Sequence, residues 1–395
     1  MIEPRIYRAA FLPALLAVVL TAFSLQNRPS AAPQGLAADV LFDGRLAAAT
    51  TRGIVRTSPD RAPGSAGNQT VAREVARRIA RSGFEVTINT FEADGRTLRN
   101  VVARRSGASR KQLVVMADRD ADSVPDATGS AADTAALIEL ARVFKGRASR
   151  RTIVLVSTDG GTLGDAGALR FARTAPDRDQ IEAVVAISDL GARRAEGPLT
   201  VQWSNDSRRG SIGLGRTVNS SLRQELDDFA GDPGPLAQMA RLAFPIGIGD
   251  QGVLLEDGLQ AVRISGSGEL PPPRGERRLE DLDVDRLGAL GRGALRSVSA
   301  LDGAPVPEPG PRSYLLTRKV LPGWTISLLA VTLIFPALVA SIDAIARARR
   351  RRERVAPWWR WIALAVLPFL IGLGVAELIV AFGGAPDVSS GAAPP

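Results

Sequence analysis

Acidic side chains are the residues of this sequence best suited to chemistry, because the chain has no histidine and no cysteine. Their absence excludes Ser-His-Asp and Cys-His catalytic arrangements, thiolate metal sites and disulfides. It also removes imidazole, a common ligand of zinc. Any metal site must therefore use oxygen ligands, which suit magnesium or calcium better than zinc.

The densest acidic run follows an apolar stretch at residues 113–116 and contains Asp118, Asp120, Asp122 and Asp126. These carboxylates could bind a hard cation weakly. The spacing does not match a calcium-binding EF-hand loop, which needs glycine at its sixth position and glutamate at its twelfth. We therefore predict no specific calcium site from this run alone.

Other nucleophiles and phosphate sites are not indicated. A Ser-Lys dyad would need a buried lysine, and lysine occurs only at Lys111, Lys145 and Lys319. These lie just before an expected strand, at the end of an expected helix and beside an apolar segment. The glycine-rich stretches GSGEL and GIGDQG lack the strand-to-helix context and the following lysine of a phosphate-binding loop.

The elements that would position the acids alternate between helices and short apolar strands, which is typical of an α/β fold. The apolar runs are rich in β-branched residues, as expected for central strands buried on both faces. We expect strands at 113–116, 153–157 and 183–187, and helices at 70–81, 131–144 and 163–172.

Three apolar segments, 9–25, 320–342 and 361–382, predict three transmembrane helices. The first also fits the core of a signal peptide with a cleavage site near residues 30–32, but we favour an uncleaved anchor. The third is interrupted only by Glu377, which could either snorkel towards water or have a function within the membrane.

The net charge of +9 is carried almost entirely by arginine. The dense arginine cluster at 343–360 lies between two apolar segments, so the positive-inside rule places it in the cytoplasm of a bacterial cell. Residues 28–318 and the C-terminal tail are then extracytoplasmic. We expect a multi-pass protein of the cell membrane that contacts the bilayer, with a possible membrane-protein partner and no nucleic-acid binding.

The order of segments between about residues 55 and 265 resembles a known family. RAPGSAGN, FEADGRTLRNVVARRSG, VVMADRDAD, AADTAALIELARVF, STDGGTLGDAGALRFAR and AVVAISDLGA follow one another as in the bacterial aminopeptidase and glutamate carboxypeptidase family of di-zinc exopeptidases, peptidase family 28 of the metallopeptidases. The resemblance implies a mixed, mainly parallel sheet with helices on both faces and a site at the carboxyl ends of its strands.

The family's chemistry uses two zinc ions bridged by a carboxylate and a glutamate base. The resemblance places the first histidine ligand at Asp118, keeps the supporting aspartate as Asp120 and places the bridging aspartate at Gly129. The pair of glutamates, base and ligand, falls on Gly161 and Thr162.

The last two ligand positions in the resemblance are an aspartate, kept as Asp189, and a histidine, which falls near Gln251. Glycine cannot supply a bridging carboxylate or a general base. Asp120 and Asp189 also have structural explanations, as side chains that bind a backbone turn and cap a loop. We therefore predict no zinc, no other cofactor and no catalytic residue at these positions.

The leading hypothesis is a membrane-anchored pseudo-peptidase that acts as an extracytoplasmic binding or scaffolding module. One alternative is an active hydrolase with an oxygen-ligand metal site around Asp118, Asp120 and Asp189; another is a sensor or accessory subunit of a membrane complex. The expected domains are an N-terminal anchor (1–28), a linker and lead-in helix (29–54), the exopeptidase-like domain (55–303), a proline-rich linker (304–319), a transmembrane helix (320–342), a basic loop (343–360), a further transmembrane helix (361–382) and a tail (383–395).

Overall fold

The computed structural model divides the chain into two compact units. The sheet unit contains residues 29–310, and the hairpin unit contains residues 1–28 and 311–387. The residues that the structure describes are 4–27, 30–32, 41–121, 125–205, 208–226, 234–243, 247–273, 277–304, 314–315, 319–352 and scattered positions from 360 to 375.

A seven-stranded mixed sheet forms the centre of the sheet unit. Its strands are β2 (Glu85–Ala93), β3 (Arg96–Arg105), β4 (Ser109–Asp118), β5 (Arg151–Thr158), β6 (Ile181–Ser188), β7 (Thr200–Val201) and β8 (Ala261–Ser265). Their order is β2-β3-β5-β4-β6-β8-β7. The inner strands β5, β4, β6 and β8 are parallel, whereas β2, β3 and β7 pair antiparallel at the two ends. This order confirms the predicted mixed, mainly parallel sheet.

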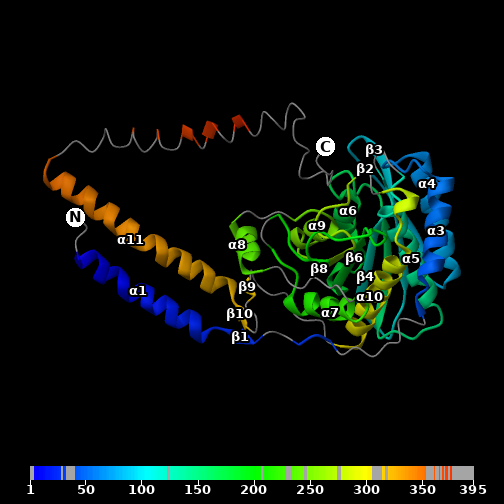
Figure 1. Ribbon diagram of the computed structural model, residues 1–395, viewed down its shortest axis with the longest axis horizontal. Coiled ribbons are helices and arrows are strands. Elements are labelled where there is room, and N and C mark those ends of the chain that lie inside the picture. Colours follow the sequence, from blue (N-terminus) through cyan, green and yellow to red (C-terminus); the bar gives the residue numbers. More distant parts are fainter. Residues whose placement is uncertain are drawn as a thin grey trace. The chain divides into compact units, whose positions relative to one another are not determined.

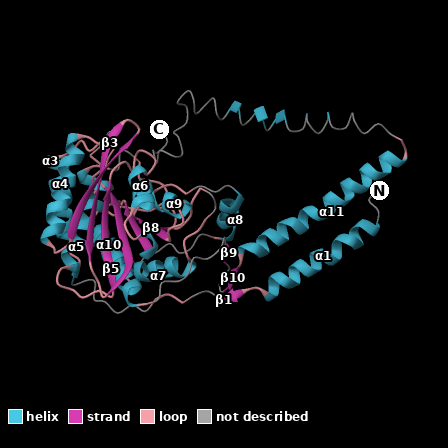
Figure 2. Cartoon of the chain, turned by 180° about the vertical axis from the view of Figure 1, so that it is seen from behind, coloured by secondary structure: helices cyan, strands magenta, loops and turns pink. Residues whose placement is uncertain are grey.

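Helices cover both faces of the sheet (Figures 1 and 2). On β4, Leu113 and Val115 belong to a large apolar cluster, and Val114 and Met116 to a smaller one. Side chains of α3 (Gly44–Thr57), α4 (Ala66–Arg81), α5 (Ser130–Phe144), α7 (Ile212–Arg223) and α10 (Val284–Gly303) join the large cluster, and those of α6 (Ala166–Thr174) and α9 (Asp250–Glu256) join the small one. A further helix, α8, spans Pro235–Ala243.

The expected elements are present with shifted ends. The expected strands correspond to β4, β5 and β6, each longer than its apolar run. The helix expected from residue 70 begins at Ala66, because Ser65 accepts a hydrogen bond from the Asn68 backbone amide at 3.2 Å and caps it. The helix expected from residue 163 begins only at Ala166, because Gly164 and Asp165 adopt positive φ angles of 64° and 56°.

The hairpin of β2 and β3 was not predicted, although the sequence contains its signal. Asp94 and Gly95 form its two-residue turn with φ angles of 49° and 66°. An Asp-Gly pair between extended runs favours this turn, because both residues tolerate positive φ. Strand β8 and helix α10 were also not predicted. The segment expected as a linker and lead-in helix supplies α3, which packs within the large core cluster through Ala47 and Ala48.

The hairpin unit contains α1 (Pro4–Phe23) and α11 (Gly323–Arg350), which lie side by side (Figure 1). Strand β1 (Gln26–Asn27), directly after α1, pairs antiparallel with β10 (Lys319–Leu321), directly before α11. The two helices therefore run in opposite directions. Strand β9 (Tyr314–Leu315) completes a small sheet with β10.

Of the three predicted membrane helices, one corresponds to a candidate membrane span among the described residues. Among the described residues, α11 is the one helix long and apolar enough to cross a membrane, while α1 contributes a shorter apolar stretch, Phe11–Phe23. Helix α11 also runs to Arg350, so the expected basic loop begins within the helix rather than after residue 342. The third expected segment lies largely outside the described residues, as does Glu377.

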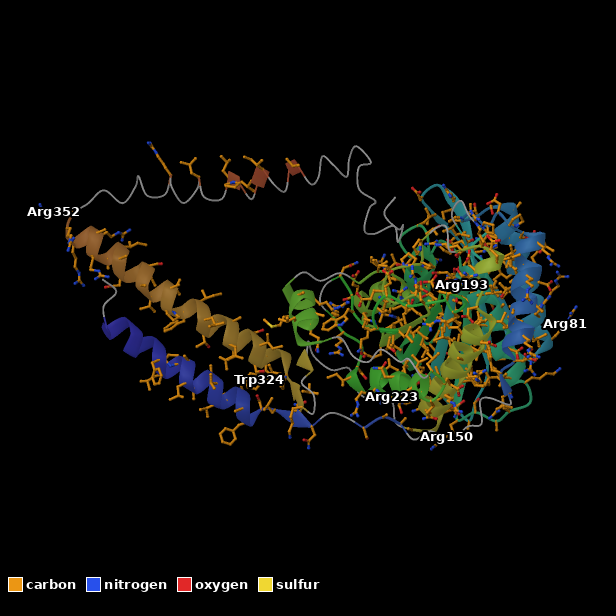
Figure 3. The ribbon with its side chains drawn as sticks, viewed as in Figure 1. Arg81, Arg150, Arg193, Arg223, Trp324 and Arg352 are labelled. Atoms are coloured by element: carbon orange, nitrogen blue, oxygen red, sulfur yellow. The ribbon has the colours of Figure 1, made fainter. Side chains whose placement is uncertain are left out.

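Arginine is dispersed over the sheet unit rather than gathered on one of its faces. Figure 3 shows Arg81, Arg150 and Arg223 at separate places on this unit. In the hairpin unit, Trp324 lies at the start of α11 and Arg352 just beyond its other end (Figure 3). Tryptophan and arginine thus mark opposite ends of the apolar helix.

Candidate functional site

The parallel strands bring the acidic loops together at their carboxyl ends. Strand β4 ends at Asp118, and the loop after β5 begins at Asp159. Strand β6 ends just before Asp189. The Thr158 hydroxyl donates a hydrogen bond of 2.6 Å to Asp118 Oδ1 and ties the ends of β4 and β5. The fold therefore assembles the site at the edge where parallel α/β sheets bind ligands.

Asp120 holds a backbone turn. Its Oδ1 accepts hydrogen bonds of 2.9 Å from the backbone amides of Gly160 and Gly161, and its Oδ2 accepts from the amide and hydroxyl of Thr162 at 3.0 and 2.9 Å. A carboxylate offers about four acceptor positions. Those of Asp120 are occupied, so it is not available to a metal ion without breaking this turn.

Gly161, where the resemblance places the family's base, faces the Asp118 carboxyl group. A Cβ atom at this glycine would lie 2.4 Å from Asp118 Oδ2, closer than real contacts allow. The space into which a glutamate would project is therefore filled by Asp118.

Gly129 is similarly enclosed, directly before α5. A Cβ atom here would lie 2.6 and 2.7 Å from the two carboxyl oxygens of Asp126 and 2.9 Å from Asp189 Oδ1. Asp126 Oδ2 accepts from the Ser130 amide at 2.7 Å, and Asp189 Oδ2 accepts from the Ser267 hydroxyl at 2.9 Å. Both acids are thus oriented by hydrogen bonds around the empty side-chain position.

Asp133, which was not predicted, fixes the loop that carries Asp189. Its two oxygens accept from the backbone amides of Asp189 and Leu190 at 2.8 and 2.9 Å. Burial, with the neighbouring Asp189 charge, raises the pKa of Asp133 well above its usual range. Burial and the nearby Asp126 charge raise the pKa of Asp189 to about 6. The sequence contains one signal for Asp133, because an acid is unusual within an expected helix that is otherwise largely apolar.

Gln251 is fully buried in α9 and holds a loop. Its Nε2 donates to the carbonyl oxygens of Trp203 at 3.2 Å and Ile248 at 2.9 Å. Its Oε1 has no hydrogen-bond partner among the described residues. The side chain near which the resemblance places the last histidine ligand therefore binds backbone groups.

Two further acids join Asp118. Asp165 precedes α6 and Asp250 is the first residue of α9, and one carboxylate oxygen from each lies within 4.8 Å of the others and of Asp118. Burial and mutual repulsion raise the pKa of all three carboxyls well above their usual range. Asp118 is thus grouped with these acids. Asp120, which the alternative hypothesis from the sequence places in one oxygen-ligand site with Asp118 and Asp189, is bound by backbone amides.

A buried ion pair stabilises the loop that carries Asp118. Arg119 and Asp159 are both fully buried, with 3.2 Å between Arg119 Nη2 and Asp159 Oδ2. Arg119 also donates to the carbonyl oxygens of Ser157 and Thr158 at 2.8 and 3.1 Å. The neighbouring Arg61 donates to the Arg119 carbonyl at 3.0 Å. These contacts fix the backbone on both sides of Asp118.

The residues present do not fit a di-zinc centre. The chain supplies no imidazole and no thiolate. The positions that the resemblance gives to the bridging ligand and the base are glycines, and other acids occupy the space of their side chains. Of the carboxylates that remain at ligand positions, Asp118 and Asp189 belong to two different groups of acids. The donor set is oxygen only, which favours hard cations over zinc.

The comparisons with known proteins agree with this fold. The model of peptidase family M28 matches residues 100–230. A zinc aminopeptidase from Bacillus subtilis, BSAP, is 11% identical over 65% of this chain and 94% of its own, with a TM-score of 0.55. A Zn-dependent exopeptidase from Parabacteroides distasonis is 17% identical over 65% and 98%, with a TM-score of 0.52. A glutaminyl cyclase from Porphyromonas gingivalis is 20% identical over 65% and 98%, with a TM-score of 0.50. No curated protein matches the sequence.

Proposed function

Because the chain belongs to the M28-like zinc exopeptidase family, we propose that it is a catalytically degenerate member that binds a ligand or partner instead of cleaving a peptide. The observation that carries this proposal is the crowding at Gly129 and Gly161. A side chain at either position would collide with carboxyl groups that belong to the fold. Loss of the bridging ligand and the base removes both the metal-bound hydroxide and its proton acceptor.

A pocket near the site supports a binding role. It has a volume of about 450 Å³ and is lined largely by apolar groups. The lining residues are Val201, Ala237, Ala240, Arg241, Ile248, Glu269 and Leu270. Arg241 and Glu269 form an ion pair at its wall, so the pocket combines apolar surface with a fixed polar group, as ligand sites do.

A hydrolysis assay tests the loss of catalysis. The full chain, purified in detergent and supplied with excess zinc, is expected to give no turnover of aminoacyl or short peptide substrates above a protein-free control. An M28 aminopeptidase assayed in the same detergent is the positive control. Zinc-dependent turnover that disappears on adding a chelator would contradict the proposal.

A second candidate is a hydrolase that uses an oxygen-ligand metal ion. The grouping of Asp118, Asp165 and Asp250 favours it, because such a site could polarise a carbonyl. The same assay with magnesium, calcium and manganese separates the two candidates. An accessory role beside a membrane-protein partner stays a prediction from the sequence.

We further propose that the hairpin unit anchors the sheet unit to the outer face of the cell membrane. Side chains along α11, among them Val331 and Leu333, are 63% and 81% exposed, which suits contact with lipid. The pairing of β1 with β10 brings Gln26 and Asn27, which follow α1, beside Val320 and Lys319, which precede α11. Arg347, Arg349 and Arg350 lie in the last turn of α11, at the opposite end, as expected for a cytoplasmic end.

The absence of cysteine makes this orientation easy to test, because a single introduced thiol is the only one in the chain. In cells with a permeable outer envelope, a membrane-impermeant maleimide is expected to label Arg81→Cys. It should label Arg352→Cys only after the cell membrane is disrupted. The reverse labelling pattern would contradict the orientation.

A further inference from the structure

We propose that Asp118, Asp165 and Asp250 form a binding site for one hard divalent cation, with calcium as the preferred ion. Each acid offers one carboxylate oxygen, and the three oxygens lie within 4.8 Å of one another. They come from the end of β4 and from the starts of α6 and α9. Asp118 stands at a ligand position of the family resemblance, whereas Asp165 and Asp250 do not, so the proposed site shares one position with the family's zinc centre and takes its other ligands from elsewhere.

Asp165 and Asp250 differ from several other buried acids of the same domain in their partners. Asp120 and Asp133 accept several backbone hydrogen bonds, and Asp159 accepts hydrogen bonds from the Gly64 and Arg99 amides besides its ion pair. Those acids have structural roles that satisfy their oxygens. Structural carboxylates are expected to be saturated in this way.

Asp250, by contrast, is 4% exposed, and its Oδ1 has no hydrogen-bond partner among the described residues. Asp165 stands at the start of a helix, where an aspartate normally caps the backbone, yet its side chain makes no capping hydrogen bond. A buried carboxylate oxygen without a partner costs free energy unless another group satisfies it. One oxygen of Asp250 lies within 4.8 Å of an oxygen of Asp118 and an oxygen of Asp165, so a cation held between the three acids would satisfy this buried carboxylate.

The charges around the three carboxylates also favour a bound cation. Arg263 is 6% exposed, and its positive charge acts on both Asp165 and Asp250. Its Nη1 and Nη2 donate to Ser188 Oγ at 3.1 Å and to the Glu269 carbonyl at 2.8 Å, and neither nitrogen donates to the three acids. The charge of Arg119 also acts on Asp118, but its guanidinium pairs with Asp159 and donates to backbone carbonyls. A divalent cation would neutralise carboxylates to which neither guanidinium donates a hydrogen bond.

The ligand type favours calcium. Calcium accepts carboxylate oxygens in flexible geometry, whereas magnesium demands a near-ideal octahedron. Three carboxylate oxygens that come from separate elements therefore suit calcium, whose coordination tolerates irregular angles. Calcium also accepts the backbone carbonyl and water ligands that would complete its coordination. The expectation from sequence that no specific calcium site exists considered only the run of acids after residue 117 and is revised by Asp165 and Asp250.

Calorimetric titration of the full chain, freed of metal with a chelator and held in detergent, tests this inference. Calcium chloride is expected to bind at one ion per chain and to raise the melting temperature. Asp250→Asn should weaken binding by about tenfold or more, because ligand charge sets calcium affinity. The matched control is Asp189→Asn, which removes a buried acid from the other group and should keep calcium binding.

Asp250→Asn should also have an effect on the melting temperature that does not depend on calcium. Removing one of three repelling carboxylates should raise the melting temperature of the metal-free protein, so misfolding is not expected. Asp165→Asn should give the same two effects, weaker calcium binding and a higher melting temperature of the metal-free protein. It serves as the test if Asp250→Asn expresses poorly. No binding of calcium, magnesium or manganese at millimolar concentration, or binding that both variants retain, would overturn the inference. Zinc-dependent hydrolysis would instead contradict the proposed function, so the two failures are distinguishable.

Discussion

Replacing Asp159 with alanine is expected to destabilise the sheet unit by about 3–5 kcal/mol, the usual cost of removing one member of a buried ion pair. Asp159 Oδ2 lies 3.2 Å from Arg119 and accepts from the Arg99 amide at 3.0 Å. Its Oδ1 accepts from Asn68 Nδ2 at 2.5 Å. The substitution leaves the Arg119 charge buried and uncompensated. Urea unfolding of the full chain in detergent measures the loss.

The pKa shifts of Asp159 and Arg119 explain why removing the Asp159 carboxylate costs so much folding stability. Burial raises the pKa of Asp159 and lowers that of Arg119, even though each favours the charged form of the other. Both charges are therefore poorly solvated, and each depends on its partner. Asp177→Ala is the matched control, because the exposed pair of Asp177 with Arg104 should contribute less than about 1 kcal/mol. An Asp159→Ala variant no less stable than this control would contradict the role of the pair.

Replacing Gly129 with aspartate, which restores the family's bridging residue, is expected to destabilise the protein by about 3 kcal/mol or more without creating a zinc site. The added Cβ would lie within 2.9 Å of oxygens of Asp126 and Asp189. Overpacking alone costs about 1–3 kcal/mol, and a further buried carboxylate adds repulsion. Thermal unfolding with and without zinc measures both effects.

Two variants separate the steric and electrostatic parts of this prediction. Gly129→Ala introduces the collision without the charge and should show a smaller loss of stability. Gly53→Asp is the control, because no atom lies within 4 Å of its Cβ position. A Gly129→Asp protein that is as stable as the parent and gains zinc-dependent activity would contradict the prediction. It would show that a single substitution restores a working zinc centre.

The sequence predicted the central strands well because these strands are buried among apolar side chains on both faces of the sheet. The runs at 113–116, 153–157 and 183–187 lie within β4, β5 and β6. The ends of the elements depended on local hydrogen bonds instead. Ser65 extends α4 at its start, and the left-handed Asp165 delays α6. Such effects involve one or two residues, so periodicity does not reveal them.

The site was harder to predict, because its members meet only in the folded chain. Position by position, the resemblance identified Gly129 and Gly161, and the structure explains their surroundings. It could not identify Asp165 and Asp250, which stand at positions where the family has no ligand. Both occur in Gly-Asp-x-Gly segments, GDAG and GDQG, at the starts of helices. Aspartates there ordinarily cap helices, and only the missing capping bonds and the convergence of their oxygens set them apart.

Carboxyl groups of the fold occupy the space that the resemblance assigns to a di-zinc centre. The most direct test is the anomalous scattering at the zinc edge from crystals of the full chain grown with excess zinc. Our account predicts no pair of zinc peaks between Asp118, Gly129 and Asp189. Two peaks a few ångströms apart at this place, with side chains moved to bind them, would contradict it.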